Sequence, residues 1–363
     1  MEQPQSERLF VIHAGTHKTA TSYIQSRMLA NRELLATAGV HLFYPASPSR
    51  KHKPLAEDLD SQEWLIWERY LAAIPQGVTQ VLISAEQFTQ PLAKAHIHQR
   101  LRRLLSQHGF RLRIVVFLRD QPDYINARFV HSTRRFYHHL NFEDYVEKQL
   151  RERSLVYDYS TLFASLLSQA SIETCFLPFR SGLGDPFERL MQSQGWIAAQ
   201  PWRPADPSKS NIQPGCRGVW LAQEVARQQQ ASNRLDASRM VNASAVIRRI
   251  AEREGWTTDR YYGFDADLLE RVAAHYADSN QRFAQRVWQQ SWREVFPNQP
   301  LKTCTYQLPA AGAERVRMLN FVPEVMRELR NNRFRRNCLL AWRSCSLSWR
   351  RLLAIANPSQ PDP

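Results

Sequence analysis

Small residues, a lysine and several hydroxyls are grouped near the N-terminus in the stretch Arg8–Met28, RLFVIHAGTHKTATSYIQSRM. An apolar run ends just before Gly15, and Lys18 follows three residues later. The hydroxyls follow at Thr19, Thr21 and Ser22. A lysine supplies positive charge, and hydroxyls and the first N–H groups of a helix donate hydrogen bonds to an anion. We therefore predict that this stretch binds a phosphate or sulfate group.

A strand, a turn and a helix are needed to position these residues. Leu9–Ile12 is short, apolar and rich in β-forming residues, which predicts a strand buried on both faces of a parallel sheet. Ala14, Gly15 and Thr16 keep the turn thin enough for a ligand to approach the backbone. A helix over Thr19–Thr37 would then present its positive N-terminal end to the ligand.

The spacing around Lys18 is not that of a nucleoside-triphosphate loop. Such a loop reads G-x-x-x-x-G-K-[ST], with glycine directly before the lysine, but His17 holds that place here. The sequence GTHKTATS instead resembles the 5′-phosphosulfate-binding loop of the sulfotransferases, G-x-x-K-T-G-T-T. The similarity to bacterial members continues through IQSRMLANRELLATAGVHLFYP. Ala20 stands where that family usually has glycine, and Ser22 where it often has threonine; both are small and helix-compatible, so we expect the loop to tolerate them.

The resemblance implies a donor, 3′-phosphoadenosine 5′-phosphosulfate, and a set of residues that contact it. The donor-binding residues of the loop would be Gly15, Thr16, His17, Lys18, Thr19, Ala20, Thr21 and Ser22. Lys18 would also be catalytic, because it would neutralise the charge that develops on the leaving phosphate oxygen. No metal is implied, and we see no carboxylate cluster in the sequence that would hold one.

A second group of residues follows the apolar run Leu112–Leu118, which ends at Arg119. The segment resembles the 3′-phosphate-binding segment of the sulfotransferases, where an arginine is followed by a serine in the next helix. Ala127 stands at the serine position, so Asn126, or alternatively Arg128 or Ser132, would replace its contact. The alternative for Arg119 is an ion pair with Asp120 or Asp123. Arg180, in FRSGLGDPFERLMQSQGW, is a further expected contact to the adenine or the 3′-phosphate.

A carboxylate follows a third apolar run, in VLISAEQF, Val81–Phe88. Glu86 resembles the strand-end carboxylate of several carbohydrate sulfotransferases, and it would remove the proton from the acceptor hydroxyl if burial raised its pKa. His17 and His13 are competing bases because they flank the same loop. The structural alternatives for Glu86 are an acid at a helix N-terminus and an ion-pair partner of Lys18.

The charge calls for anionic partners. The chain has 363 residues and a formal net charge of +14, supplied mostly by arginine, which suits phosphates and sulfates. A nucleotide donor together with an acidic glycan or a membrane surface accounts for it. No zinc-finger, basic-zipper or RNA-binding motif is visible, so nucleic acid is not expected. Five cysteines without metal spacing, no signal peptide and no apolar run long enough to cross a bilayer predict a cytoplasmic protein, with peripheral contact to the inner membrane as an extension.

Apolar runs alternate with helical patterns in the first half of the chain, which predicts an α/β fold: a P-loop-type parallel sheet flanked by helices, with a mainly helical C-terminal part. The expected strands are Leu9–Ile12, Val40–Tyr44, Val78–Ala85, Leu112–Leu118 and Ile172–Phe179. The expected helices are Thr19–Thr37, Gln62–Ile74, Pro91–Gln107, a segment near Ser160–Ser168, Val219–Gln229, Ala243–Glu254, Ala266–Gln289 and Ala313–Leu329. The segment Pro45–Pro54, PASPSRKHKP, is expected to be a basic loop.

The chain is expected to consist of three parts. Residues 1–200 would form the donor-binding core, and residues 201–330 a helical part that completes the same domain and contributes acceptor contacts. Residues 331–363 would form a basic amphipathic tail. Arginines alternate with apolar clusters over Asn331–Ile355, which suits either a helix on an anionic membrane or a helix packed on the protein's own core.

The favoured function is sulfuryl transfer from 3′-phosphoadenosine 5′-phosphosulfate to a hydroxyl or amine of a glycan or glycolipid by in-line displacement. One alternative is a non-catalytic module of the same fold that binds an anion, since Ala20 and Ala127 depart from the family pattern. A P-loop kinase is the other, but it needs a magnesium-binding aspartate at a strand end where Arg119 stands. The acceptor and the oligomeric state are not readable from the sequence.

Overall fold

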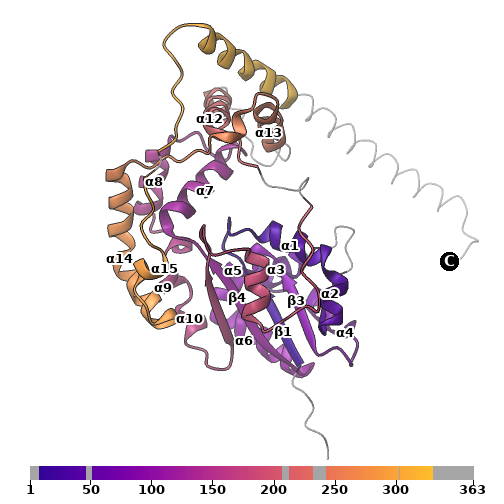
Figure 1. Ribbon diagram of the computed structural model, residues 1–363. Coiled ribbons are helices and arrows are strands. Elements are labelled where there is room, and N and C mark those ends of the chain that lie inside the picture. The colour runs from indigo at the N-terminus through magenta and orange to yellow at the C-terminus, as the bar shows by residue number, and fades with distance from the viewer. Residues whose placement is uncertain (1–7, 46–50, 207–211, 232–242, 302, 330–363) are drawn as a thin grey trace, which may run out of the picture. The chain divides into compact units, whose positions relative to one another are not determined.

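The protein contains a single five-stranded parallel sheet among its described residues, and helices flank it (Figure 1). The computed structural model describes residues 8–45, 51–206, 212–231, 243–301 and 303–329. The strands are β1 (Arg8–His13), β2 (Val40–His41), β3 (Gln80–Ser84), β4 (Phe110–Leu118) and β5 (Glu173–Pro178). Their order is β2-β3-β1-β4-β5, so β1 is central. The predicted α/β fold class is confirmed.

The central strand is buried on both faces because side chains alternate along it. Val11 packs with Leu82 and Val115 of the neighbouring strands and with residues of helices α1 (Thr21–Ala30) and α11 (Pro186–Ser193). Phe10 points to the opposite face, where its ring lies 5.8 Å from that of Trp67. This double burial explains why β1 reads as a continuous apolar run, and it holds the strand that carries the loop.

The strand ends differ from the prediction mainly at the edge of the sheet. The predicted strand Val40–Tyr44 is reduced to β2, Val40–His41, which pairs only with Gln80 and Val81 of β3. An edge strand has one neighbour, and after His41 the chain leaves that neighbour. The other four strands lie within two residues of the predicted starts and ends.

The remaining described helices before the long C-terminal helices are α2 (Arg32–Thr37), α3 (Lys53–Ser61), α4 (Leu65–Ala72), α5 (Thr89–Ala93), α6 (Ala95–Gln107), α7 (Gln121–Thr133), α8 (Phe142–Arg151), α9 (Tyr159–Leu162) and α10 (Ala164–Leu167). Short 3₁₀ helices η1 (Glu86–Phe88) and η2 (Leu155–Tyr157) accompany them. Helix α8 was not predicted. Lys53 and Pro54 begin α3 instead of ending the basic loop Pro45–Pro54, whose residues 46–50 lie outside the described part.

The prediction of one helix over Thr19–Thr37 was wrong. Helix α1 starts at Thr21 because Ala20 is in the left-handed region, with φ 60°, and a left-handed residue cannot continue a right-handed helix. The helix also stops at Ala30, and α2 begins at Arg32. Asn31 separates the two helices and exchanges hydrogen bonds with the backbone of Arg203: its Nδ2 donates to the carbonyl at 2.9 Å and its Oδ1 accepts from the N–H at 2.7 Å.

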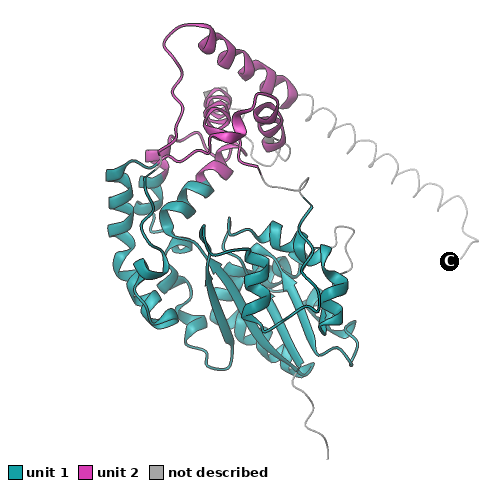
Figure 2. Ribbon diagram, in the orientation of Figure 1, with its two compact units in different colours: residues 1–128, 146–211, 264–301 teal, residues 129–145, 212–263, 302–363 magenta. Residues whose placement is uncertain are grey.

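The chain divides into two compact units (Figure 2). Unit 1 comprises residues 1–128, 146–211 and 264–301 and includes the sheet, α14 (Ala266–Trp288) and α15 (Trp292–Val295). Unit 2 comprises residues 129–145, 212–263 and 302–363. Its helices α12 (Gly215–Ala231), α13 (Ala243–Arg253) and 313–329 pack around a core that contains Leu221, Ile247 and Val322. The mainly helical C-terminal part is thus confirmed.

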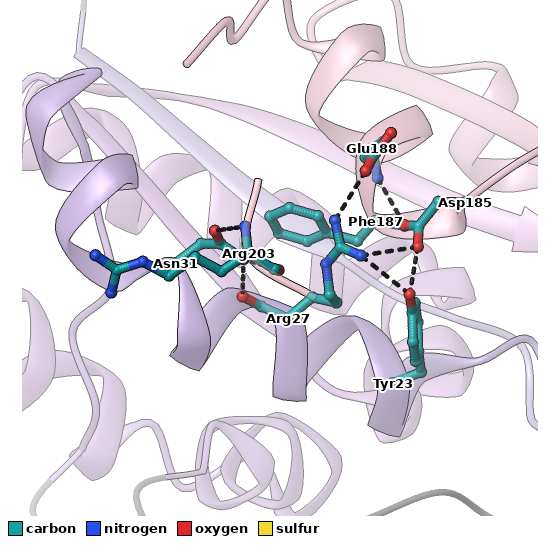
Figure 3. Close-up of polar contacts among 7 residues, drawn as sticks. All are labelled: Tyr23, Arg27, Asn31, Asp185, Phe187, Glu188 and Arg203. Atoms are coloured by element: carbon teal, nitrogen blue, oxygen red, sulfur yellow. Dashed lines mark hydrogen bonds and ion pairs between the residues drawn. The ribbon is translucent and has the colours of Figure 1, made fainter. Parts of the chain in front are cut away.

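A buried arginine joins α1 to the start of α11 (Figure 3). Arg27 is 5% exposed, and its guanidinium donates to Asp185 at 3.1 Å and to Glu188 at 2.9 Å. Asp185 is also the N-cap of α11, since its side chain accepts from the N–H groups of Phe187 and Glu188, and Tyr23 donates to it as well. This Arg27 cluster fixes the helix that follows the loop.

The predicted amphipathic tail, Asn331–Ile355, lies outside the described residues. Among the described helices, none has the length and apolar character needed to span a membrane.

Candidate functional site

The loop after β1 is held by β4 at the carboxyl edge of the sheet. Ala14 N–H donates to the carbonyl of Val115 at 2.8 Å, and the Thr16 hydroxyl donates to the carbonyl of Phe117 at 3.0 Å. From the other side, the Thr89 hydroxyl donates to the carbonyl of Gly15 at 2.8 Å. Open parallel sheets bind ligands at this edge. The loop is therefore fixed on both sides at the place where such a sheet forms its site.

Gly15 is required because the loop is crowded by its own hydroxyls. A Cβ at this position would overlap the hydroxyl of Thr21 and would lie 2.9 Å from that of Thr19. Thr19 cannot turn away cheaply, since its hydroxyl donates to the carbonyl of Thr16 at 2.6 Å. The absence of a side chain lets the loop curl back onto the first turn of α1.

Two loop residues adopt left-handed backbone conformations, Lys18 with φ 70° and Ala20 with φ 60°. An alternation of left-handed and ordinary residues turns successive N–H groups toward one side, an arrangement that suits an anion. It also explains why glycine suits position 20: only glycine adopts this region without strain. Ala20 is tolerated because it is small. The helix compatibility expected from the sequence has no effect, because Ala20 lies before the first residue of α1.

We expect Ala20→Gly to raise the free energy of unfolding by about 0.5–1 kcal/mol. Relief of the left-handed conformation is worth about 1–2 kcal/mol, and the greater freedom of glycine in the unfolded chain offsets part of it. Urea titration would measure the change. Ala274→Gly, at an exposed position inside α14, is the matched control and should lower stability by about 1 kcal/mol. Equal losses in both variants would contradict the conformational assignment at Ala20.

Two buried polar atoms next to Gly15 have no hydrogen-bond partner among the described residues: Oγ1 of Thr21 and Nε2 of His13. Buried polar groups in proteins are nearly always paired. An anion oxygen at the loop would accept from Thr21, and the N–H groups at the start of α1 would add further donors. The residues present therefore fit a phosphate or sulfate group.

His13 is a core residue of β1. It is 0% exposed, its Nδ1 shares a hydrogen bond with the Ser84 hydroxyl at 2.8 Å, and burial lowers its pKa from 6.5 to about 3. This burial favours a structural role over the role of a base that meets an acceptor. His52 is similarly buried on α3's N-terminal side, and burial lowers its pKa to about 4.

The buried histidine makes stability depend on pH. Between pH 6.5 and pH 3 the unfolded chain binds a proton at His13 and the folded chain does not, so stability falls as the pH falls. From pH 7.5 to pH 5 we expect His13 alone to cost about 2 kcal/mol of unfolding free energy. Urea titrations across this range would measure it. His13→Gln should flatten the slope between pH 6 and pH 5 by about 1.2 kcal/mol per pH unit; an unchanged slope would refute the assignment.

Arg119 lies against the loop from the end of β4. Its guanidinium donates to the carbonyl of Lys18 at 3.4 Å, lies 3.8 Å from the Asp123 carboxylate and stacks 5.8 Å from the centre of the Phe179 ring. The ion pair anticipated as the alternative is thus present with Asp123, but it is partly exposed and of little energetic weight. The structure brings Arg119 and the Lys18 loop together.

Glu86 and His17 form a pair beside the loop. The Glu86 carboxylate lies 3.4 Å from Nδ1 of His17, and the two side chains are 33% and 40% exposed. Two of the three candidate bases of the sequence interpretation, Glu86 and His17, are therefore neighbours. Tyr124, which the sequence interpretation missed, lines the same cleft: its hydroxyl is hydrogen-bonded to the His17 backbone and the Arg128 side chain, and burial raises its pKa. The only sequence feature that could have pointed to Tyr124 is its position, one helical turn into the helix that follows Arg119.

Two other expected contacts, Asn126 and Arg180, lie on other elements of unit 1. Asn126 is buried on α7, two positions from Tyr124, and residues two apart point to different sides of a helix. Arg180 donates to the carbonyl of Val295 at 2.9 Å and to that of Ser181 at 3.4 Å, which fixes it against α15. Their roles toward a donor remain predictions. Ser22 is exposed on the first turn of α1.

No group of three or more histidine, cysteine, aspartate or glutamate side chains arranged for a metal ion occurs within the described ranges.

Neither a protein-family model nor a curated protein sequence matches the chain. Among solved structures, the fold is similar to that of a sulfotransferase from Alicyclobacillus acidocaldarius, with a TM-score of 0.40 and 14% sequence identity. The similarity covers 79% of this chain and 99% of the other. A likeness of this extent carries no argument about function, which has to come from the site.

Proposed function

We propose that the protein is a sulfotransferase that moves a sulfuryl group from 3′-phosphoadenosine 5′-phosphosulfate to a hydroxyl of a glycan or glycolipid. The observation that carries the proposal is the contact of the Arg119 guanidinium with the backbone carbonyl of Lys18, at the carboxyl ends of neighbouring strands. The donor has two separate anionic groups, the phosphosulfate and the 3′-phosphate. Lys18 would contact the first and Arg119 the second. The resemblance of GTHKTATS to a phosphosulfate-binding loop adds the sulfur chemistry.

The donor would lie with its phosphosulfate on the loop and its 3′-phosphate toward Arg119. Thr19, Thr21 and the first N–H groups of α1 would hold the phosphosulfate. In the reaction, the acceptor oxygen forms a bond to sulfur while the bond from sulfur to the 5′-phosphate oxygen breaks. Lys18 would neutralise the charge that appears on that oxygen, so catalysis would come mainly from positioning and electrostatics.

The acceptor proton would pass to the pair formed by Glu86 and His17. Both residues line a cleft beside the loop, together with Thr16 and Tyr124. A carboxylate next to an imidazole can both receive a proton and orient the group that receives it. The site therefore offers a proton acceptor beside the loop that would hold the donor.

Isothermal titration calorimetry with adenosine 3′,5′-bisphosphate, followed by a radiolabelled sulfate-transfer assay, tests the function. We expect the bisphosphate to bind more tightly than ATP, and Arg119→Ala to weaken it by about 10- to 100-fold through the lost charged hydrogen bonds. The affinity for adenosine 5′-phosphosulfate, which lacks the 3′-phosphate, should fall much less in this variant. Arg103→Ala, exposed on α6, is the matched control.

Three results would contradict parts of this proposal. Preference for ATP over the bisphosphate would favour phosphoryl transfer by a kinase. Tight binding of the bisphosphate without transfer to any acceptor of a glycan and alcohol panel would indicate a non-catalytic module. Equal affinity of Arg119→Ala and the wild-type protein for the bisphosphate would overturn the 3′-phosphate assignment.

A further inference from the structure

A cleft of about 340 Å³ lies beside the loop, within unit 1. Thr16 and His17 of the loop and Glu86 line one side, and Glu57 and Asp60 of α3 line another. Sites for small molecules usually measure roughly 300–1,000 Å³, so the cleft suits a compact ligand of about one or two sugar rings. Because the Glu86–His17 pair is part of its wall, a hydroxyl bound in the cleft would lie next to the proposed base.

The charge of this cleft is opposite to that of the whole chain. The chain has 48 lysines and arginines against 34 aspartates and glutamates. Yet three carboxylates line the cleft, those of Glu57, Asp60 and Glu86, and no lysine or arginine is among its described lining residues. The net positive charge of the chain therefore does not indicate the charge of the acceptor, since the cations near the loop do not line the cleft.

Two of the carboxylates have lysine partners, which an ammonium group of a ligand would have to displace or join. Lys53 contacts Oε1 of Glu57 at 2.6 Å and Lys94 contacts Oδ1 of Asp60 at 3.2 Å. Both pairs are about half exposed, and such pairs hold little energy and exchange readily with other cations. In each pair, the lysine contacts one of the two oxygens of the carboxylate.

The positions of Glu57 and Asp60 allow both carboxylates to act on one cation. They are three residues apart on α3, so their side chains are neighbours on one face of the helix. An ammonium group has three N–H donors and forms its strongest hydrogen bonds with carboxylates. A ligand carboxylate or phosphate at the same place would face two like charges.

We propose that this cleft binds the acceptor, and that the acceptor is a compact hydroxyl compound bearing a protonated amine, such as an amino sugar. The inference rests on the proposed function and narrows its acceptor. The ammonium group lies between Glu57 and Asp60, the hydroxyl lies at the Glu86–His17 pair, and the sulfuryl group arrives from the loop. In the transfer, the acceptor oxygen binds sulfur, its proton goes to the pair, and the bond to the 5′-phosphate breaks.

Three sugars with one skeleton test the acceptor class: methyl glucosaminide, methyl glucoside and methyl glucuronide. With the sulfuryl donor, we expect kcat/KM for the amine to exceed that of the neutral sugar by about tenfold, and the acid to be the poorest acceptor. Asp60→Asn and Glu57→Gln should each remove most of this preference by raising KM for the amine. Their kcat, and all constants for the neutral sugar, should stay within about twofold. Glu63→Gln, an exposed carboxylate outside the cleft, is the matched control.

Ligand-observed NMR of the same three sugars, with adenosine 3′,5′-bisphosphate present, separates this inference from the proposed function. Binding of methyl glucosaminide that weakens in Asp60→Asn and Glu57→Gln supports the cleft assignment, even if no sulfate is transferred and the proposed function fails. Binding that is equal in the wild-type protein and both variants overturns the inference. Stronger binding of the glucuronide than of the amine also overturns it, whatever the transfer assay shows.

Discussion

Lys18→Ala should lower kcat for sulfuryl transfer by about a thousandfold. The lysine follows the turn at Gly15, and its backbone is in the left-handed region. Under the proposed function, its charge would matter most when the bond to sulfur breaks and negative charge appears on the leaving oxygen. Removal of one such preorganised group typically costs about 10²–10³ in kcat. Stopped-time assays with labelled donor at saturating acceptor would measure the loss.

The same substitution should affect ground-state binding far less than turnover, because the interaction strengthens only in the transition state. We expect the Kd for adenosine 3′,5′-bisphosphate to rise by about tenfold or less. Lys148→Ala removes an exposed lysine of α8 that pairs with Glu152 and should leave both quantities unchanged. A Lys18→Ala enzyme that keeps more than a tenth of its turnover would show that the lysine only binds the donor.

Glu86→Gln should lower turnover by about 10²–10⁴-fold, the usual contribution of a positioned general base. The amide keeps the shape of the carboxylate but cannot take the proton of the acceptor. Affinity for the bisphosphate should stay near the wild-type value, since Glu86 is not among the residues expected to contact the donor. Glu68→Gln, exposed on α4, is the matched control for the loss of one surface carboxylate.

The contact between Glu86 and His17 makes the double variant the informative one. If the two groups act as one unit, Glu86→Gln with His17→Ala should cost no more than the larger single effect, because residues that act together lose their function together. Multiplied effects would mean independent roles. A Glu86→Gln enzyme that keeps most of its activity, beside a His17→Ala enzyme that loses it, would identify the base as the histidine.

Most of the sheet could be predicted from the sequence, because strands buried in a parallel sheet are continuous apolar runs. Leu112–Leu118 was recognised as a strand and is extended in β4 only to Phe110. The breaks between helices were not recognised, since their causes are tertiary. Asn31 separates α1 from α2 while bonded to Arg203, and Lys94 is extended between α5 and α6. Neither residue is a helix breaker by type.

The parts of the site that lie in one chain segment could be predicted from the sequence. The parts formed by several segments were harder to predict. The residues of the loop are adjacent in sequence, and Arg119 directly follows an apolar run. The cleft draws on α3, which was taken in part for a loop, and on Tyr124, which no local pattern marks. The pairing of Glu86 with His17 also joins two strands, so only the register of β1 against β3 reveals it.

The Arg27 cluster sets the order in which this site can come into existence during synthesis. Arg27 and Asp185 are separated by 158 residues, and β1 pairs only with β3 and β4, which are made later. Chains emerge from the ribosome N-terminus first. The loop therefore emerges before α11, and its helix cannot be anchored until α11 has followed. In the meantime Phe10, Val11 and Ile12 have no neighbouring strands, so the apolar side chains of β1 cannot be buried in the sheet until β3 and β4 have been made.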